Sequence, residues 1–148
     1  MLADLGRDAS ALVGGSRGHS ADALTLGFEL AAAHYRPLHV VHALGGQSLF
    51  PCPDLIGHET LSRSRDAAGR YLDECLSGYD EKFPDVQVHR QVVQETPTQA
   101  LVAASRTASA VIVGRGRRPV HSQVLGSVSR GVVERAHSTV VVVGGAGR

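Results

Sequence analysis

Two glycine clusters with arginines near them stand close to the C-terminal end of the sequence. The first is the run 114–118, Gly-Arg-Gly-Arg-Arg, directly after an apolar segment, and the second is Gly126 followed by Ser127. Backbone N–H groups at the start of a helix lack internal partners, and the helix dipole favours an anion there. Glycine lets a phosphate approach the backbone closely, since it has no side chain. The spacing therefore predicts a phosphate cradle made by a strand end and a helix start.

Other interpretations of these residues have to be weighed against the cradle. Glycines after strands are common in turns, and a serine before a helix is commonly a cap. The pattern G-x-x-x-x-G-K-[ST] is absent, because the sole lysine, Lys82, does not follow a glycine. The dinucleotide pattern G-x-G-x-x-G fails at Pro119, which stands where the third glycine belongs. The two best-known phosphate motifs are thus excluded.

Strands and helices are predicted to alternate along the chain. Apolar runs predict five strands, at residues 10–14, 37–44, 85–93, 109–114 and 138–144. Helical periodicity predicts four helices, at residues 19–35, 58–79, 96–107 and 127–137, with Ser20 and Thr96 as caps and Pro97 in a first turn. This order favours a parallel sheet with right-handed crossovers. We expect one doubly wound, Rossmann-like α/β domain over residues 1–148, with helices on both faces.

The carboxyl ends of the predicted strands bring several small residues to one rim. Ligands of open parallel sheets bind at this rim, where the strand order reverses. The segments that end there are Gly14-Gly15-Ser16, Ala43-Leu44 and 114–116, and the start of the last helix joins them. Hydroxyl groups of Ser127 and Ser129 are candidate additional donors there.

The composition is that of a soluble, globular chain without a strong charge bias. Of 148 residues, 43% are hydrophobic and 20% charged, and the net charge is +1. Domains dedicated to nucleic acid are usually more basic, so we expect no nucleic-acid partner. No run approaches the roughly 18 to 20 apolar residues of a membrane span, and the N-terminus is unlike a signal peptide. Cys52 and Cys75 lack C-x-x-C spacing, and we expect reduced thiols in a cytoplasmic protein.

The histidines and acids do not predict a metal centre or a catalytic group. His39 and His42 are three residues apart on a predicted strand, so their side chains point to opposite faces. The other histidines lack a cysteine or carboxylate at ligand spacing. Hydrolysis would need a general base and a metal carboxylate near the cradle, yet no acid lies between Ala110 and Gly131. We expect the chain to hold a ligand, with slow hydrolysis at most.

The sequence resembles the universal stress proteins, small cytoplasmic α/β proteins of which many bind ATP. Their ATP-binding subgroup has G-x-x-G-x9-G-[ST] between the fourth strand and the last helix. Here Gly116, nine further residues, Gly126 and Ser127 fit, as does LGSVSRGVVERA before a valine-rich strand. The resemblance covers nearly the whole chain, including HSADAL and LHVVHAL. It implies a sheet like that of adenine nucleotide α-hydrolases, in the order 3-2-1-4-5.

The resemblance also implies a ligand, a contact set and a partner. The ligand would be ATP, with or without Mg²⁺. Phosphate and ribose contacts would come from the glycine clusters and their neighbours: Val113, Gly114, Arg115, Gly116, Arg117, Gly126, Ser127, Val128 and Ser129. The base would meet Ala43 and Gly14 or Gly15. The last strand, Thr139–Val143, would form a homodimer, which agrees with its apolar character at a sheet edge.

Two departures from the family pattern concern the ligand. The interval Gly114-x-Gly116 is one residue shorter than in the family, so the loop must be tighter or Val113 must share its role. The family's ATP binders have an Asp at the end of the first strand, whereas Gly14 and Gly15 stand here. Loss of one hydrogen bond to a charged group costs about 1.5 to 3 kcal/mol, roughly ten- to hundredfold in affinity.

Three functions remain open from the sequence. The first is a dimeric stress-response protein in which bound ATP is the signal. The second is a nucleotide-free member of the same family that acts through protein contacts, favoured by the two departures. The third is an ATP pyrophosphatase of a related fold, whose first strand ends in S-G-G-x-D-S. The segment VGGSRG matches that pattern poorly, with Val13 and Arg17 at the diagnostic positions.

Overall fold

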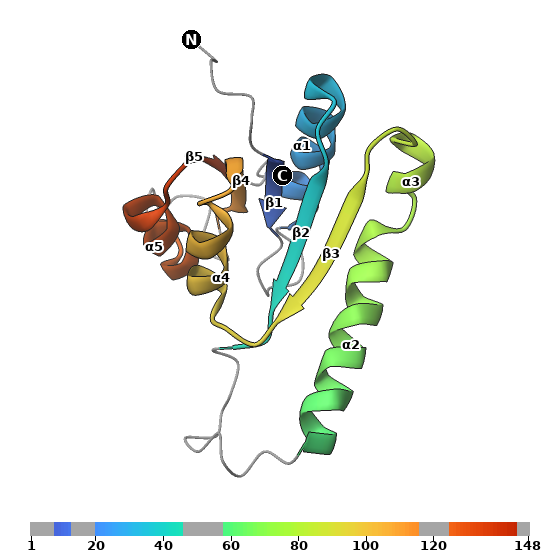
Figure 1. The fold of residues 1–148 in the computed structure, drawn as a ribbon, viewed down its shortest axis with the longest axis vertical. Coiled ribbons are helices and arrows are strands. Elements are labelled where there is room, and N and C mark those ends of the chain that lie inside the picture. Colours follow the sequence, from blue (N-terminus) through green and yellow to red (C-terminus); the bar gives the residue numbers. More distant parts are fainter. Residues whose placement is uncertain (1–7, 13–19, 46–57, 116–124, 145–148) are drawn as a thin grey trace.

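A parallel sheet forms the centre of the molecule (Figure 1). The computed structural model describes residues 8–12, 20–45, 58–115 and 125–144. The strands are β1 (Asp8–Leu12), β2 (Leu38–Ala43), β3 (Val88–Val93), β4 (Ala108–Gly114) and β5 (Thr139–Val143). The helices are α1 (Ser20–His34), α2 (His58–Leu76), α3 (Tyr79–Lys82), α4 (Pro97–Ala104) and α5 (Ser127–Arg135). The sheet has the order β3-β2-β1-β4-β5, and neighbouring strands are parallel.

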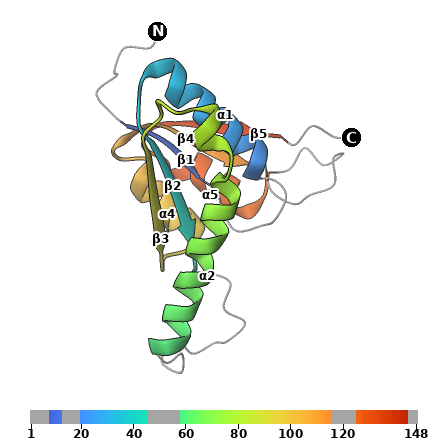
Figure 2. The ribbon, with the colours of Figure 1, turned by 90° about the vertical axis from the view of Figure 1, so that its right-hand side faces the viewer.

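Two apolar clusters lie on opposite faces of the sheet. Side chains alternate along a strand, so Val40 of β2 and Ile112 of β4 pack with α1 and α2, and Val41 and Val111 pack with α4 and α5. The first cluster includes Phe28, which is fully buried. Helix α2 runs beside β3 and continues beyond the carboxyl ends of β2 and β3 (Figures 1 and 2). The predicted α/β fold with parallel strands is confirmed.

The predicted helix over residues 58–79 is confirmed from His58 to Leu76, where α2 ends, and the separate short helix α3 begins at Tyr79. Gly78 has a φ of 84°, a left-handed conformation that ends α2 and begins the short α3. Tyr79 then stacks on Phe28 with ring centroids 4.6 Å apart, and its hydroxyl group lies 2.8 Å from the Thr25 hydroxyl. Glycine is a common stop signal for a helix, so Gly78 is the feature of the sequence that marks this break.

Several predicted boundaries shift by a few residues. Strand β1 begins at Asp8 rather than residue 10, and residues 13 and 14 lie outside the described ranges. Helix α5 ends at Arg135 because Ala136 adopts an extended conformation, with ψ of 149°. The start of α4 is confirmed: Thr96 and Gln99 form a reciprocal capping box, and Pro97 occupies the first turn. Among the described helices, none has the length and apolar character needed to cross a membrane.

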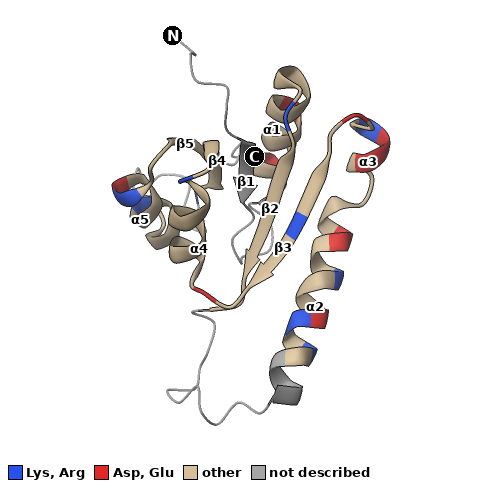
Figure 3. Ribbon diagram, viewed as in Figure 1, with Lys and Arg blue, Asp and Glu red and all other residues tan. Residues whose placement is uncertain are grey.

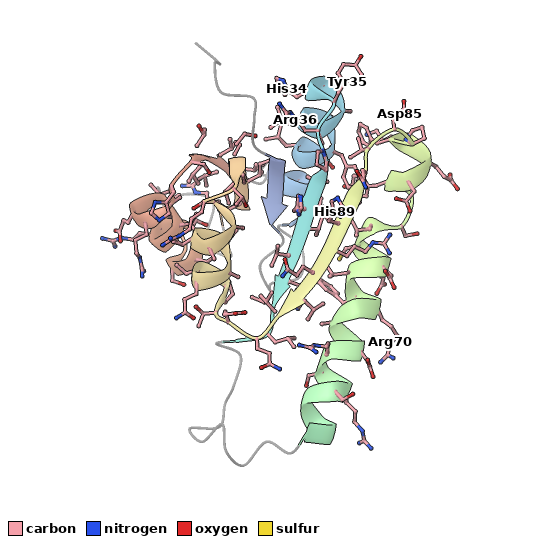
Figure 4. The ribbon with its side chains drawn as sticks, in the orientation of Figure 1. His34, Tyr35, Arg36, Arg70, Asp85 and His89 are labelled. Carbon is pink, nitrogen blue, oxygen red and sulfur yellow. The ribbon has the colours of Figure 1, made fainter. Side chains whose placement is uncertain are left out.

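Helix α1 ends in a strained residue. Tyr35 has a φ of 53° and is 93% exposed, and its side chain extends outward at the end of α1 (Figure 4). The N–H of Arg36 donates to the Ala31 carbonyl at 2.9 Å, and that of Tyr35 donates to the Ala32 carbonyl at 3.3 Å. These bonds form a Schellman cap, in which glycine normally takes the left-handed position. Tyr35 therefore adopts a left-handed backbone conformation that is strained for any residue with a side chain.

Tyr35→Gly is expected to raise the free energy of unfolding by about 1 kcal/mol, because glycine adopts the left-handed conformation without strain. The exposed ring has little packing to lose. Urea denaturation provides the measurement. Tyr35→Ala is the control, since alanine keeps the strain and should give no comparable gain. A lower stability of the glycine variant would contradict the assignment of strain to Tyr35.

Candidate functional site

The predicted cradle has two arms, the strand end at 113–117 and the helix start at 126–129. Backbone and side-chain hydrogen bonds join these arms at the end of β4. The N–H of Gly126 donates to the carbonyl of Arg115 at 3.1 Å. The hydroxyl group of Ser129 donates to the carbonyl of Gly114 at 2.7 Å. Residues 116–124 lie outside the described ranges, and with them the predicted contacts Gly116 and Arg117. The strand end and the helix start are thus adjacent.

Strand β5 closes the other side of this junction. Gly114 and Val143 are register partners at the ends of β4 and β5, and the N–H of Arg115 donates to the carbonyl of Val143 at 2.8 Å. Since its carbonyl accepts from Gly126, both backbone groups of Arg115 are used inside the fold.

The start of α5 presents backbone donors at this junction. Gly126 is the N-cap, and the first helical bond runs from the N–H of Arg130 to the Gly126 carbonyl at 2.9 Å. The N–H groups of Ser127, Val128 and Ser129 precede that bond, and no carbonyl of the described ranges accepts from them. The first turn of α5 contains no acidic residue. This combination of donors, helix dipole and absent negative charge favours an anion.

The backbone conformation at position 126 does not require a glycine. Its φ of −61° and ψ of 161° lie in the extended region, which any residue adopts. Ser, Thr, Asp and Asn are the better N-caps, because their side chains bond to the first-turn N–H groups. A glycine here leaves those N–H groups uncapped by a side chain, and the structure describes no side-chain cap.

Ser129 has a different role from the one its position in the motif suggests. The residue is 2% exposed, and its hydroxyl proton is donated to Gly114. Its backbone N–H is the donor that remains for a ligand. Ser127, by contrast, is exposed at the helix start. The two serines therefore divide into one that joins the arms and one that faces outward.

The base side of the predicted site lies at the ends of β1 and β2. Ala43 is 1% exposed, so its methyl group and its backbone are both almost fully buried. The following N–H groups, of Leu44 and Gly45, donate to Val93 and Glu95 carbonyls at 2.8 and 3.1 Å. The other base-side candidates, Gly14 and Gly15, lie outside the described residues.

Gly45 is a structural requirement that the sequence analysis did not identify. A Cβ at this position would lie 2.5 Å from the Gln94 carbonyl oxygen and 2.6 Å from the Glu95 carbonyl carbon. No side chain fits at that distance from backbone atoms. The signal available in the sequence was a glycine two residues after the end of a strand, which is common enough in turns to be overlooked.

The histidines form ring contacts instead of a metal centre. His39 stacks on His89 with ring centroids 4.6 Å apart, and the buried His42 lies 5.5 Å from the ring of Tyr71 in α2. His89 is seen on β3 in Figure 4. Within the described ranges, no group of three or more His, Cys, Asp or Glu is placed to hold a metal ion. Cys75 is a free thiol, and Cys52 lies outside those ranges.

Charged side chains of both signs are interleaved along α2 (Figure 3). Arg90 of β3 joins this surface, with its guanidinium 2.7 Å from Asp73 and 3.8 Å from Asp80. These three side chains are 43 to 70% exposed, so each ion pair contributes little to stability. The pairs connect β3 with α2 and α3 at the surface.

The sequence has clear relatives. Residues 11–144 match the model of the universal stress protein family. A universal stress protein of Mycobacterium tuberculosis is 35% identical over 121 residues, which cover 81% of this chain and 40% of the relative. The chain therefore spans about 40% of the length of this curated relative.

Solved structures share the fold over almost the whole chain. Universal stress protein UspA from Lactobacillus plantarum has a TM-score of 0.70 at 16% identity, covering 93% of this chain and 98% of that one. A universal stress protein in complex with cAMP has 0.64 at 22%, covering 95% and 99%. One from Archaeoglobus fulgidus in complex with dAMP has 0.62 at 17%, covering 92% and 96%. At these identities the likeness establishes the fold.

Ser129→Ala is expected to lower the free energy of unfolding by about 1 to 3 kcal/mol, because the half-buried Gly114 carbonyl loses the hydroxyl donor of the buried Ser129. Chemical denaturation monitored by circular dichroism provides the measurement. Ser127→Ala is the matched control, and its exposed position predicts a change within about 0.5 kcal/mol. Equal effects of the two substitutions would show that the Ser129–Gly114 bond does not join the arms.

Proposed function

The chain belongs to the universal stress protein family, and on that premise we propose that it binds ATP or a related adenine nucleotide at the junction of β4 and α5. The observation that carries the proposal is the set of N–H groups of Ser127, Val128 and Ser129 beside the end of β4, which have no carbonyl acceptor among the described residues. Phosphate is the anion suited to several convergent backbone donors. Arg115 adds a cationic side chain at the same junction.

The complexes of related structures support an adenine nucleotide as the ligand. One relative was solved with cAMP and another with dAMP, and both ligands combine adenine with a phosphate group. We assign the phosphates to the arms at 113–117 and 126–129, and the base to Ala43 and Gly14 or Gly15. Mg²⁺ would arrive as the counter-ion of ATP, since the first turn of α5 offers donors and no carboxylate.

We propose that the signal is whether a nucleotide is bound, and not the hydrolysis of ATP. Hydrolysis of ATP requires a group that activates water near the terminal phosphate. Glu134, the acid of α5, lies near the other end of that helix and pairs with Arg130 at 3.1 Å. The arrangement suits a protein whose nucleotide-bound and nucleotide-free forms differ in their interactions.

Mg-ATP is expected to raise the melting temperature of the wild-type protein by several degrees, because ligand at about 100 times Kd stabilises the native state by about 2.7 kcal/mol. Gly126→Val should remove this shift, since the extended backbone accepts valine while its side chain crowds the phosphate. Differential scanning calorimetry provides the measurement.

Gly69→Val is the matched control for this substitution. A Cβ at Gly69 in α2 meets nothing within 4 Å, and the position lies away from the end of β4. This variant should keep the full shift. If millimolar Mg-ATP gave no shift in the wild-type protein, the ATP proposal would fail and the nucleotide-free function through protein contacts would be favoured. An unchanged shift in Gly126→Val would place the phosphate elsewhere.

We also propose that β5 pairs with a second copy of the chain. Strand β5 is at the edge of the sheet, and Val140, Val141, Val142 and Val143 are all partly exposed. An apolar edge strand left uncovered promotes uncontrolled association, and a closed dimer is the common way to cover it. Residues Thr139–Val143 are therefore the proposed interface.

Val141→Lys is expected to convert the dimer to a monomer, because the charge would be buried against the partner strand. Sedimentation velocity provides the measurement, with circular dichroism to verify the fold. Val133→Lys, at the exposed valine of α5, is the control that should remain dimeric. A dimer that persists in Val141→Lys, or a monomeric wild-type chain, would contradict the β5 interface.

A further inference from the structure

The ends of β2 and β3 form a rigid corner, which we define as residues 43–45 and 93–95. Bonds from the N–H groups of Leu44 and Gly45 to Val93 and Glu95 tie the two chain segments together beyond the strands. The backbone of Gly45 approaches Gln94 so closely that no side chain fits between them. The two segments therefore hold a fixed relative position.

Glu95 is the acid of this corner, and its backbone is held on both sides. Its carbonyl accepts from Gly45, and the next residue, Thr96, begins the capping box of α4. The N–H of Thr96 donates to the side-chain oxygen of Gln99 at 3.2 Å, and the Gln99 N–H donates back to the Thr96 hydroxyl at 3.3 Å. The side chain of Glu95 is exposed at the rim. A carboxylate thus stands on a preorganised turn at the carboxyl end of the sheet.

The position of this corner matches one end of an extended nucleotide. In the order β3-β2-β1-β4-β5, three strand spacings separate β3 from β4. At about 4.8 Å each, these spacings give roughly 14 Å between Glu95 and the phosphate junction. A nucleotide with its phosphates at the start of α5, running along the rim toward β2, brings its base to this corner.

We propose that Glu95 determines base specificity by accepting a hydrogen bond from the exocyclic amino group of a 6-aminopurine. This inference rests on the proposed nucleotide site. An ionised carboxylate only accepts hydrogen bonds, so it favours a 6-amino group and repels a 6-oxo group. Sites built to bond a particular donor discriminate strongly against analogues that lack it. The connection from β3 to α4 contains no basic residue that would reverse this preference (Figure 3).

The test compares ATP with inosine triphosphate, which differs from ATP at position 6 of the purine. Isothermal titration calorimetry should show that the wild-type protein binds ATP at least about tenfold more tightly than inosine triphosphate. This factor corresponds to the free energy of one hydrogen bond to a charged group. Glu95→Gln keeps the shape of the side chain and adds a donor, so this preference should fall about tenfold while inosine triphosphate binding persists.

Glu81→Gln is the matched control, since it makes the same charge change on α3, at the opposite end of β3 (Figure 1). Its preference for ATP should equal that of the wild-type protein. An unchanged preference in Glu95→Gln, with both nucleotides still bound, would overturn the role of Glu95 alone. If the wild-type protein bound neither nucleotide, the proposed function would fail and the specificity inference with it.

Discussion

The hydrogen bonds that join the end of β4 to the start of α5 are the interaction on which the candidate site depends. The carbonyls of Gly114 and Arg115 accept from Ser129 and Gly126, so the strand and the helix meet at a fixed point. The same residue, Arg115, donates to the end of β5. These bonds satisfy the strand-end groups from within the fold. Among the described residues, the donors left without a carbonyl acceptor at this junction are those of the first turn of α5.

The parallel sheet explains why the binding groups gather at one end of the molecule. All five described strands run in the same direction, so their carboxyl ends form a common rim. The apolar clusters on the two faces fix the helices that begin at that rim. Burial of apolar surface therefore provides the stability, whereas the rim supplies backbone groups for a ligand. Backbone strain occurs at the opposite end of the sheet, at Tyr35, which precedes β2.

Sequence patterns predicted the features that depend on local chemistry. The buried run of β4, the cap at Thr96 and the start of α5 at Ser127 each follow from periodicity or capping preference, and the structure confirms them. The break at Gly78 was missed although glycine is a helix stop signal, because the apolar spacing continues across it. The close approach at Gly45 and the bond made by Ser129 were also missed, since both depend on distant parts of the chain.

An amide-resolved NMR titration with Mg-ATP observes the proposed backbone donors themselves. The largest chemical-shift changes on binding are expected at the N–H groups of Ser127 and Val128, at the start of α5. The N–H of Arg115, which is bonded to Val143, should change less. Saturable binding that leaves the amides of Ser127 and Val128 unchanged, with shifts gathered elsewhere, would contradict an anion site at this helix.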